Sequence, residues 1–392
     1  MAISETTSRL SSTARATSSS AIRDLLSQAR RPDVVSMAGG LPAPDALPVE
    51  RVAAAVDRVL TTAGRAALQY GLTEGEPRFR EWAARREGVS VERIVTTSGA
   101  QQGLDLVCRA LLEPGDAVVV SEPDYLGALQ CFRSHRARLV GVATDGEGID
   151  VAAIEQLAAS GQQPKVCYVV PTFHNPTGSV LSTERRVALA DVAARHGIVV
   201  IEDEPYRDLW FRHQPPPVIG PGSDHVVRLR STSKILAPGL RVGWIDAPGW
   251  LTPALARLKQ CTDLQTSTFT QLVAVDVLDE PGWLDEHLVT LRSHYRTRSD
   301  ALLAALRAEF GDRIEARAVL GGMFAWARLP GVDTSTLLAE ALDRGVTFVP
   351  GAVFGVERPD AEALRLSFST LAPDELRTGV RRLAAAVSAL ST

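Results

Sequence analysis

Short apolar runs alternate with amphipathic stretches of helical length between about residues 48 and 250. The runs at 116–123 and 197–205 contain Val and Ile without alternating polar residues, which is typical of strands buried on both faces of a sheet. Helical patterns at 100–112 and 182–197 follow or separate such runs. Because strands that alternate with helices pair in parallel, we expect an α/β fold with a mainly parallel sheet of about seven strands, covered by helices on both faces.

The chain has 392 residues, which is more than one ordinary compact domain needs. Residues 253–265 and 283–311 have the pattern of long helices that connect to a second unit. We therefore expect three parts. Residues 1–47 form an N-terminal arm and helix that pack against the active site and the small domain, 48–285 form a large cofactor-binding domain, and 286–392 form a smaller α+β domain.

Composition excludes several classes of protein. The net charge of −4 argues against general binding to nucleic acid or to a membrane surface, and no apolar run approaches the roughly 18 residues of a membrane helix. The four cysteines form no C-x-x-C pair, so we expect reduced thiols and a cytoplasmic protein. Because the seven histidines are scattered, we expect no zinc cluster and no metal.

The N-terminal segment has two interpretations. It is rich in Ser, Thr and Arg and has few acidic residues, as organelle transit peptides do. The alternative, which we favour, is a partly ordered arm that leads into a helix beginning near residue 20.

Lysine is scarce in this chain. Lys and Arg together number 42, yet the only lysines are Lys165, Lys234 and Lys259. Lysine can lose its proton and attack a carbonyl group, whereas arginine stays protonated. Lys234 lies in the loop sequence STSKILAPGLRVG, so it is our candidate for a reactive amine. Lys165 and Lys259 are expected to be exposed to solvent.

Polar residues follow the carboxyl ends of four predicted strands. These are Ser98 to Gln101, Asn175, Asp203 with Tyr206, and Ser231 with Ser233 and Lys234. In an open parallel sheet, ligands bind beyond this edge. We therefore expect the four strand ends to meet in one crevice.

The chemistry of these residues indicates one ligand. The helix start at Gly99 to Gln101, the two serines and Arg241 suit a phosphate. A poorly hydrated Asp203 needs a cationic partner, such as a protonated pyridine nitrogen. Tyr206 and Asn175 can bond a phenolate oxygen, and Lys234 can attack an aldehyde. Together these features describe pyridoxal 5′-phosphate. The alternative for Asp203 alone is a helix cap.

The motifs NPTG and S-x-S-K…PG-x-R-x-G, in this order, resemble those of the fold-type I, pyridoxal-phosphate-dependent aminotransferases of class I/II. The chain is most similar to the branch that contains the 2-aminoadipate, kynurenine and aromatic amino acid aminotransferases. The similarity extends from SAIRDLL to LRLSFSTL, which is nearly the whole chain. Three positions depart from the common pattern, namely Phe79, His174 and Thr232, and the last two leave the specificity open.

The resemblance implies a role for each matching residue. Lys234 forms the aldimine with the cofactor and then moves the proton, and Asp203 pairs with the ring nitrogen. The ring hydroxyl is held by Asn175 and Tyr206, and the ring is stacked by Tyr125. The phosphate is bound by Gly99, Ala100, Gln101, Ser231, Ser233 and Arg241, and by Tyr70 of a second subunit in a homodimer.

Four further residues are implied to contact the substrate. Arg365 binds its α-carboxylate, Gly39 and Gly40 lie close to it, and Arg23 lies near its side chain. The alternatives are an Arg365 that faces solvent from a strand buried on one side, an Arg23 on an ordinary amphipathic helix, and packed aromatic roles for Tyr70 and Tyr125.

These implications predict amino-group transfer from an L-amino acid to a 2-oxo acid, with 2-oxoglutarate as the expected acceptor, in two half-reactions through Lys234. Two alternatives stay open. One is another pyridoxal-phosphate reaction, such as that of a β-lyase, a decarboxylase, or an oxidative or cyclising enzyme of secondary metabolism. The other is a ligand-sensing transcription regulator, although no basic DNA-binding segment precedes the resemblance.

Overall fold

The structure is a computed structural model that describes residues 9–16 and 33–390. Its largest element is an eight-stranded sheet in the order β2-β9-β8-β7-β6-β3-β4-β5. The strands are β2 (Ile94–Thr97), β3 (Ala117–Glu122), β4 (Arg138–Asp145), β5 (Gly148–Ile149), β6 (Val166–Val169), β7 (Val199–Asp203), β8 (Val226–Ser231) and β9 (Gly243–Asp246). The five central strands from β8 to β4 pair in parallel, whereas β9 is antiparallel to both of its neighbours.

The mainly parallel α/β sheet is confirmed, but the expected number of strands was one too low. The additional strand, β5, has two residues and pairs antiparallel with the end of β4 at the edge of the sheet. Such a short strand is set by its turn rather than by a hydrophobic run, so the sequence pattern does not reveal it.

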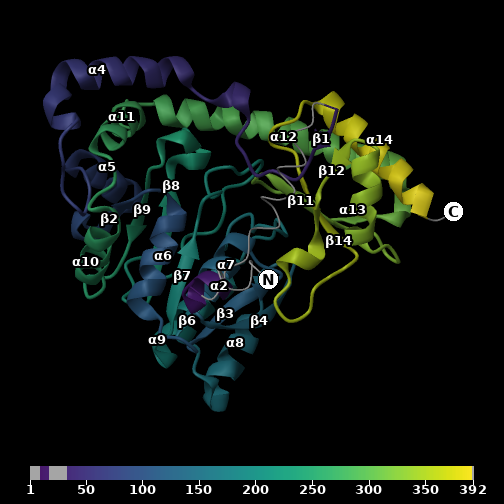
Figure 1. Cartoon of the computed structure of the whole chain (residues 1–392), viewed down its shortest axis with the longest axis horizontal. Helices are drawn as coiled ribbons and strands as arrows, with labels where there is room; N and C mark the ends of the chain where they lie inside the picture. Colours follow the sequence, from purple (N-terminus) through teal and green to yellow (C-terminus); the bar gives the residue numbers. More distant parts are fainter. Residues whose placement is uncertain (1–8, 17–32, 391–392) are drawn as a thin grey trace.

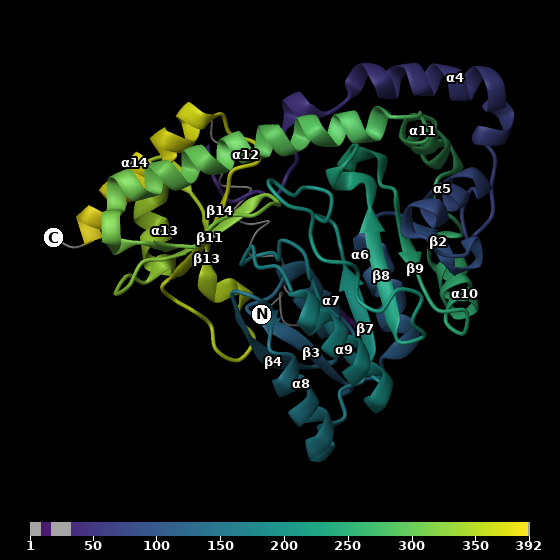
Figure 2. The ribbon, with the colours of Figure 1, turned by 180° about the vertical axis from the view of Figure 1, so that it is seen from behind.

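The strands are buried on both faces, as their composition predicts. On β6, Val166 and Tyr168 belong to the larger hydrophobic core, while Cys167 and Val169 belong to a second core on the opposite face. Helices cover these two faces (Figures 1 and 2). They are α5 (Pro77–Glu87), α6 (Ala100–Leu111), α7 (Leu126–Ser134), α8 (Val151–Leu157), α9 (Thr183–His196) and α10 (Thr252–Asp263). Helix α11 (Thr268–Leu278) packs against α5, and α4 (Val49–Ala67) packs along α11 on the side away from the sheet.

A second unit contains a four-stranded antiparallel sheet in the order β10-β11-β14-β13. Its strands are β10 (Glu315–Ala316), β11 (Phe324–Arg328), β13 (Val349–Pro350) and β14 (Ala363–Ser367), and its helices are α13 (Thr334–Asp343) and α14 (Pro373–Leu390). Near the N-terminus, α2 (Ser12–Ala16) precedes β1 (Val35–Ser36), which pairs in parallel with β12 (Val346–Thr347) of this unit.

Helix α12 (Trp283–Phe310) connects the two units. It extends from beside α11, near the large sheet, to α14 at the opposite end of the molecule (Figures 1 and 2). The helix begins close to the expected boundary at residue 285. The division at residues 47 and 285 nevertheless stays a prediction.

One expectation about exposure is wrong, that for Lys259, and the alternative of a solvent-facing Arg365 is excluded. Lys259 lies on α10 and is buried. Its burial is possible because Nζ pairs with Oδ1 of Asp263, one turn further along the helix, at 2.8 Å. Arg365 is 2% exposed, so it does not face solvent. Its strand, β14, lies between β11 and β13 and is covered on both faces, and every residue of the strand is buried.

Lys165 is partly exposed, as expected, and pairs with Asp116 at 2.8 Å. In the described part of the chain, no helix combines the length and the apolar character that crossing a membrane requires.

Candidate active site

A cavity of about 860 Å³ lies where the carboxyl ends of the central strands meet the second unit. It is lined by twelve of the residues selected from the sequence, namely Gly40, Ala100, Gln101, Tyr125, Asn175, Asp203, Tyr206, Ser231, Ser233, Lys234, Arg241 and Arg365. The four strand ends therefore do meet in one crevice.

Three predicted residues within the described part of the chain do not line this cavity. Gly99 lies directly behind it against Arg241, and Gly39 adjoins the lining residue Gly40. Tyr70 is 78% exposed and lies on a different part of the surface, beside Gln265 and Thr268. Arg23 lies outside the described residues.

Lys234 reaches the cavity from a short helical turn after β8. Its Nζ donates a hydrogen bond of 2.9 Å to the carbonyl oxygen of Gly40. Burial, followed by the charge of Arg241, lowers the pKa of Lys234 to about 8. A large fraction of this amine is therefore neutral near pH 8, which is the form that acts as a nucleophile or a base.

Asp203 ends β7 and is buried at the back of the cavity. Its Oδ2 accepts a hydrogen bond of 2.8 Å from the Tyr168 hydroxyl, whereas Oδ1 has no hydrogen-bond partner among the described residues. Burial raises the pKa of Asp203 to about 7. A buried carboxylate with a free oxygen atom is costly unless a cation with an N–H group binds to it.

Another part of the cavity lining carries hydrogen-bond donors suited to an anion. Helix α6 begins after Gly99 with no side chain capping its N-terminus, so its first N–H groups can bind an anion. Gly99 adopts a φ of +91°, and a Cβ atom there would lie 2.6 Å from Nη2 of Arg241. The Ser231 hydroxyl donates to that of Ser233 at 2.7 Å. These donors suit a phosphate group.

Arg365 lies deep in the cavity wall. Its Nη1 donates to Asn175 Oδ1 at 2.8 Å and its Nη2 to the carbonyl oxygen of Ala38 at 2.6 Å, while Nε has no partner among the described residues. The guanidinium carbon lies 4.2 Å from the ring centre of Phe324. Burial lowers the pKa of Arg365 to about 10, so the group is still a cation at neutral pH.

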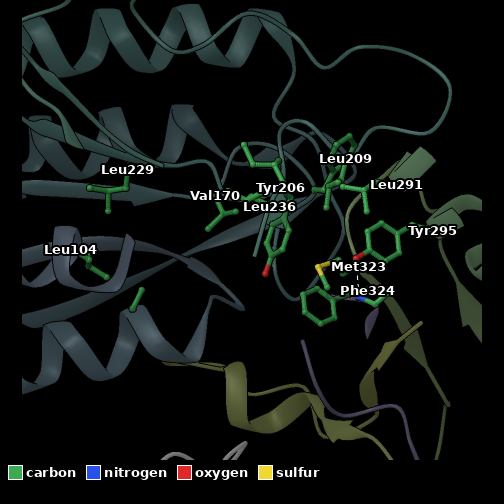
Figure 3. Packing of buried hydrophobic residues seen from close by; sticks show 14 of the residues in the cluster. Leu104, Val170, Tyr206, Leu209, Leu229, Leu236, Leu291, Tyr295, Met323 and Phe324 are labelled. Carbon is green, nitrogen blue, oxygen red and sulfur yellow. Dashed lines mark hydrogen bonds between the residues drawn. The ribbon is translucent and has the colours of Figure 1, made fainter. Parts of the chain in front are cut away.

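Two aromatic residues bring the two units together at the cavity. Tyr206, which follows β7, and Phe324, on β11, pack edge to face with ring centres 5.9 Å apart (Figure 3). Tyr206 also hydrogen-bonds Asn175. A Cβ atom at Gly40 would lie only 2.8 Å from Phe324, so a larger residue at position 40 would displace this ring.

The two unusual residues of the sequence motifs do not line the cavity. Thr232 is buried, and its hydroxyl donates to the carbonyl oxygen of Val242 at 2.9 Å. His174 is also buried; its Nε2 lies 3.2 Å from Asp124 Oδ1 and its Nδ1 lies 2.9 Å from the Thr177 hydroxyl. Both residues therefore act on the cavity only through the loops that they hold.

Among the residues of the site that sequence reasoning missed are Tyr168 and Phe324. Tyr168 lies inside a buried strand, where its hydroxyl needs a partner, and this was the one available signal. Phe324 lies in the apolar run GGMFAWARL, where nothing distinguishes it from other core residues. Its role depends on the way the second unit packs over the first.

The residues present fit pyridoxal phosphate. The unpaired oxygen of Asp203 suits the pyridine N–H, the start of α6 with Arg241 suits the phosphate, and Lys234 suits the aldehyde. The fold and the cavity thus define the class, which is that of pyridoxal-phosphate-dependent enzymes of fold type I.

Comparison with known proteins supports this class. A family model described as aminotransferase class I and II matches residues 32–383. The chain is 39% identical to an aromatic-amino-acid aminotransferase of Thermococcus litoralis, over 93% of this chain and 90% of that protein.

Two solved structures are also similar. One is an α-aminoadipate aminotransferase from Thermus thermophilus in complex with N-(5′-phosphopyridoxyl)-L-leucine, with a TM-score of 0.92, 36% identity and 98% of each chain covered. The other is a kynurenine aminotransferase of Pyrococcus horikoshii, with a TM-score of 0.94, 35% identity and 100% of each chain covered.

The chain belongs to the class I and II aminotransferase family. It is a pyridoxal-phosphate-dependent enzyme that transfers an amino group between an amino acid and a 2-oxo acid.

Proposed function

We propose that this enzyme transfers the α-amino group of a large L-amino acid to 2-oxoglutarate in two half-reactions, with the same cavity serving both. The observation that carries this proposal is the pairing of two perturbed groups in one cavity: Asp203, which has a free buried oxygen, and Lys234, which has a lowered pKa. The buried acid needs a cationic partner, and the amine is largely neutral. Together the two groups suit pyridoxal-phosphate chemistry and few other reactions.

The cofactor would be held at both ends. Asp203 would bind the ring nitrogen, Asn175 and Tyr206 the ring hydroxyl, and Tyr125 the face of the ring. The first turn of α6, with Ser231, Ser233 and Arg241, would bind the phosphate. When bound, pyridoxal phosphate supplies an electron-withdrawing ring that stabilises negative charge at the substrate Cα.

Lys234 would move the proton. Its Nζ would take the proton from the substrate Cα as a base and would later return it as an acid. The lowered pKa favours the neutral form that this step requires. The carbonyl oxygen of Gly40, 2.9 Å from Nζ, orients the amine.

Arg365 would orient the substrate. Its two Nη atoms are already held by protein oxygens, while Nε has a free donor and the whole group is positioned by Phe324. A cation fixed in this way binds a carboxylate in one orientation. The substrate α-carboxylate would therefore lie against Arg365, with the Cα–H bond toward Lys234.

Large side chains fit the rest of the cavity. Leu41, Tyr125 and Phe324 supply apolar lining, and Gln101 and Gln130 add amide groups. Similar proteins named for aromatic amino acids, kynurenine and 2-aminoadipate support such donors. We propose aromatic amino acids as the preferred donors. The role of Arg23 near the substrate side chain stays a proposal, as do those of Gly39 and Gly40.

We further propose that the active unit is a homodimer in which Tyr70 of each subunit completes the phosphate site of the other. Its 78% exposure, at a distance from this chain's own cavity, supports a contact with a second copy. A cytoplasmic location is proposed from the free thiols of Cys108, Cys131, Cys167 and Cys261.

A half-reaction tests the proposal. Stoichiometric holoenzyme is mixed with phenylalanine without an acceptor, and products are quantified. We expect one equivalent of the 2-oxo acid and conversion of the cofactor to pyridoxamine phosphate, followed by full reversal when 2-oxoglutarate is added. Other products in place of this exchange would assign the cavity to another reaction. Release of ammonia would indicate a lyase, release of carbon dioxide a decarboxylase, and consumption of oxygen an oxidase.

A further inference from the structure

Two cysteines and a histidine meet beside the active-site cavity, although the sequence predicts no zinc cluster. Cys108 lies on α6, Cys131 lies on α7, and His135 follows the end of α7. The two sulfur atoms are 4.0 Å apart. One ligand atom of each residue lies within 4.8 Å of the other two.

The spacing suits a metal ion. In a tetrahedral site with Zn–S bonds of about 2.3 Å, two thiolates lie roughly 3.8 Å apart. The observed separation of 4.0 Å needs little adjustment. Cys131 and His135 are four residues apart, so both reach the same side of α7 and face Cys108 on the neighbouring helix.

A carboxylate supports the histidine. His135 Nε2 lies 2.9 Å from Oδ1 of Asp105, three residues before Cys108 on α6. The imidazole also hydrogen-bonds the Cys131 thiol. A histidine that contacts a carboxylate through one ring nitrogen is the common arrangement around protein-bound zinc, because the carboxylate fixes the orientation of the ring.

The cluster is accessible through the cavity. Cys108 is fully buried, whereas Cys131 is 8% exposed and lines the cavity together with Asp105 and Ser134. An ion can therefore reach Cys131 from the cavity.

We propose that Cys108, Cys131 and His135 bind one thiophilic divalent cation of the Zn²⁺ type between α6 and α7, with the fourth position open to water or a small anion from the cavity. On binding, each thiol releases its proton to the solvent and forms a metal–sulfur bond, with no change of oxidation state. The ion ties α6, which begins at the phosphate-binding turn, to α7, which begins after Tyr125.

Cobalt substitution tests the site directly. The holoenzyme is treated with a chelator and a phosphine reductant and then titrated with Co²⁺. We expect one equivalent to bind with the strong visible bands of tetrahedral thiolate-bound Co²⁺, at wavelengths longer than those of the cofactor. Zn²⁺ should displace it and abolish the bands.

Variants identify the ligands. C131S and H135Q should weaken Co²⁺ binding roughly 100-fold or more, since even the loss of a supporting partner costs 10–100-fold. C261S is the matched control, because Cys261 is an exposed thiol outside the cluster, and it should bind Co²⁺ as the wild type does. Binding that persists in C131S and H135Q, or that is lost in C261S, would overturn the proposal.

Thiol labelling gives a readout that needs no variant. Iodoacetamide should modify Cys131 slowly through the cavity in metal-free holoenzyme and at least roughly tenfold more slowly with Zn²⁺, while Cys261 reacts at the same rate in both. Equal labelling of Cys131 with and without Zn²⁺ would contradict the site. A peptide map that shows a Cys108–Cys131 disulfide in the reduced, chelated protein would contradict it as well.

Discussion

Tyr168 and Asp203 lie on neighbouring parallel strands, and the Tyr168 hydroxyl donates a 2.8 Å hydrogen bond to Oδ2 of Asp203. This bond stabilises the charged carboxylate against the effect of burial, which raises the pKa of Asp203 to about 7. Tyr168 is therefore proposed as a positioning residue, because it favours the ionised form that the proposed pairing of Asp203 with the ring nitrogen requires.

The variant Y168F should weaken cofactor binding. A hydrogen bond to a buried charged group contributes about 1.5–3 kcal/mol, so we expect the dissociation constant of pyridoxal phosphate to rise roughly 10- to 100-fold. Equilibrium dialysis of the apoenzyme measures it. Y295F is the control, because Tyr295 is equally buried but its hydroxyl accepts from the Ala43 N–H outside the cavity. Unchanged affinity in Y168F would show that Asp203 needs no support from Tyr168.

Without the cofactor, the free energy of unfolding should depend on pH because of Asp203. Its pKa is about 7 in the folded chain against an ordinary value of 3.8, so the folded form holds the proton more tightly. The resulting stabilisation is complete below about pH 4 and is lost as the pH rises to about 7. It amounts to at most about 4 kcal/mol, at about 1.4 kcal/mol per pKa unit.

Urea unfolding of the apoenzyme from pH 4 to 7 measures this effect. D203N cannot titrate there, so the free energy of unfolding of the wild type should fall relative to that of D203N as the pH rises. D145N is the control: the hydrogen bond from Arg185 lowers the pKa of Asp145, so its titration lies mainly below pH 4 and its difference from the wild type should stay nearly constant over this range. A constant difference between the wild type and D203N over this range would contradict the raised pKa.

Replacing Arg365 with lysine should impair both half-reactions. The Arg365 guanidinium bonds Asn175 and Ala38 through its two Nη atoms and still has Nε free for a carboxylate. The single ammonium group of lysine cannot reproduce this arrangement. We expect KM for the amino donor and for 2-oxoglutarate to rise roughly 100-fold. Steady-state kinetics of R328K provide the control, because Arg328 lies on the adjacent strand β11 and pairs with Asp360 and Glu362 near the surface. Wild-type KM values in R365K would remove the carboxylate role.

Mixed dimers test the role of Tyr70. Y70F and K234A are each expected to be impaired, Y70F by roughly tenfold for the loss of one phosphate hydrogen bond. In a purified Y70F/K234A heterodimer, the one site that contains Lys234 would receive Tyr70 from the other subunit. About half of wild-type activity should return per dimer. A heterodimer with no more activity than Y70F itself would place the effect of Tyr70 within its own subunit.

The sequence was sufficient to predict contacts that follow from strand order. Asn175, Asp203 and Lys234 each follow a hydrophobic strand, and parallel strands bring their carboxyl ends to one edge. Contacts between helices, or between the two units, have no such rule. Lys259 has the spacing of a solvent-facing residue until Asp263 folds against it, and Phe324 resembles any core residue until it meets Tyr206.

The cluster beside the cavity illustrates the same point. Cys108 and Cys131 are far apart in sequence and form no familiar motif, so their 4.0 Å approach depends on how α6 packs against α7. Helix packing angles depend on the shapes of many side chains together. For this reason the sequence pattern predicts each helix without predicting which of its residues touch.

Hydride trapping tests the central claim most directly. The holoenzyme is reduced with borohydride, digested and analysed by peptide mass spectrometry, and the three lysines serve as internal controls for one another. We predict one pyridoxyl group per chain, on the peptide that contains Lys234, with Lys165 and Lys259 unmodified. A pyridoxyl group on either other lysine, or on none, would contradict the account.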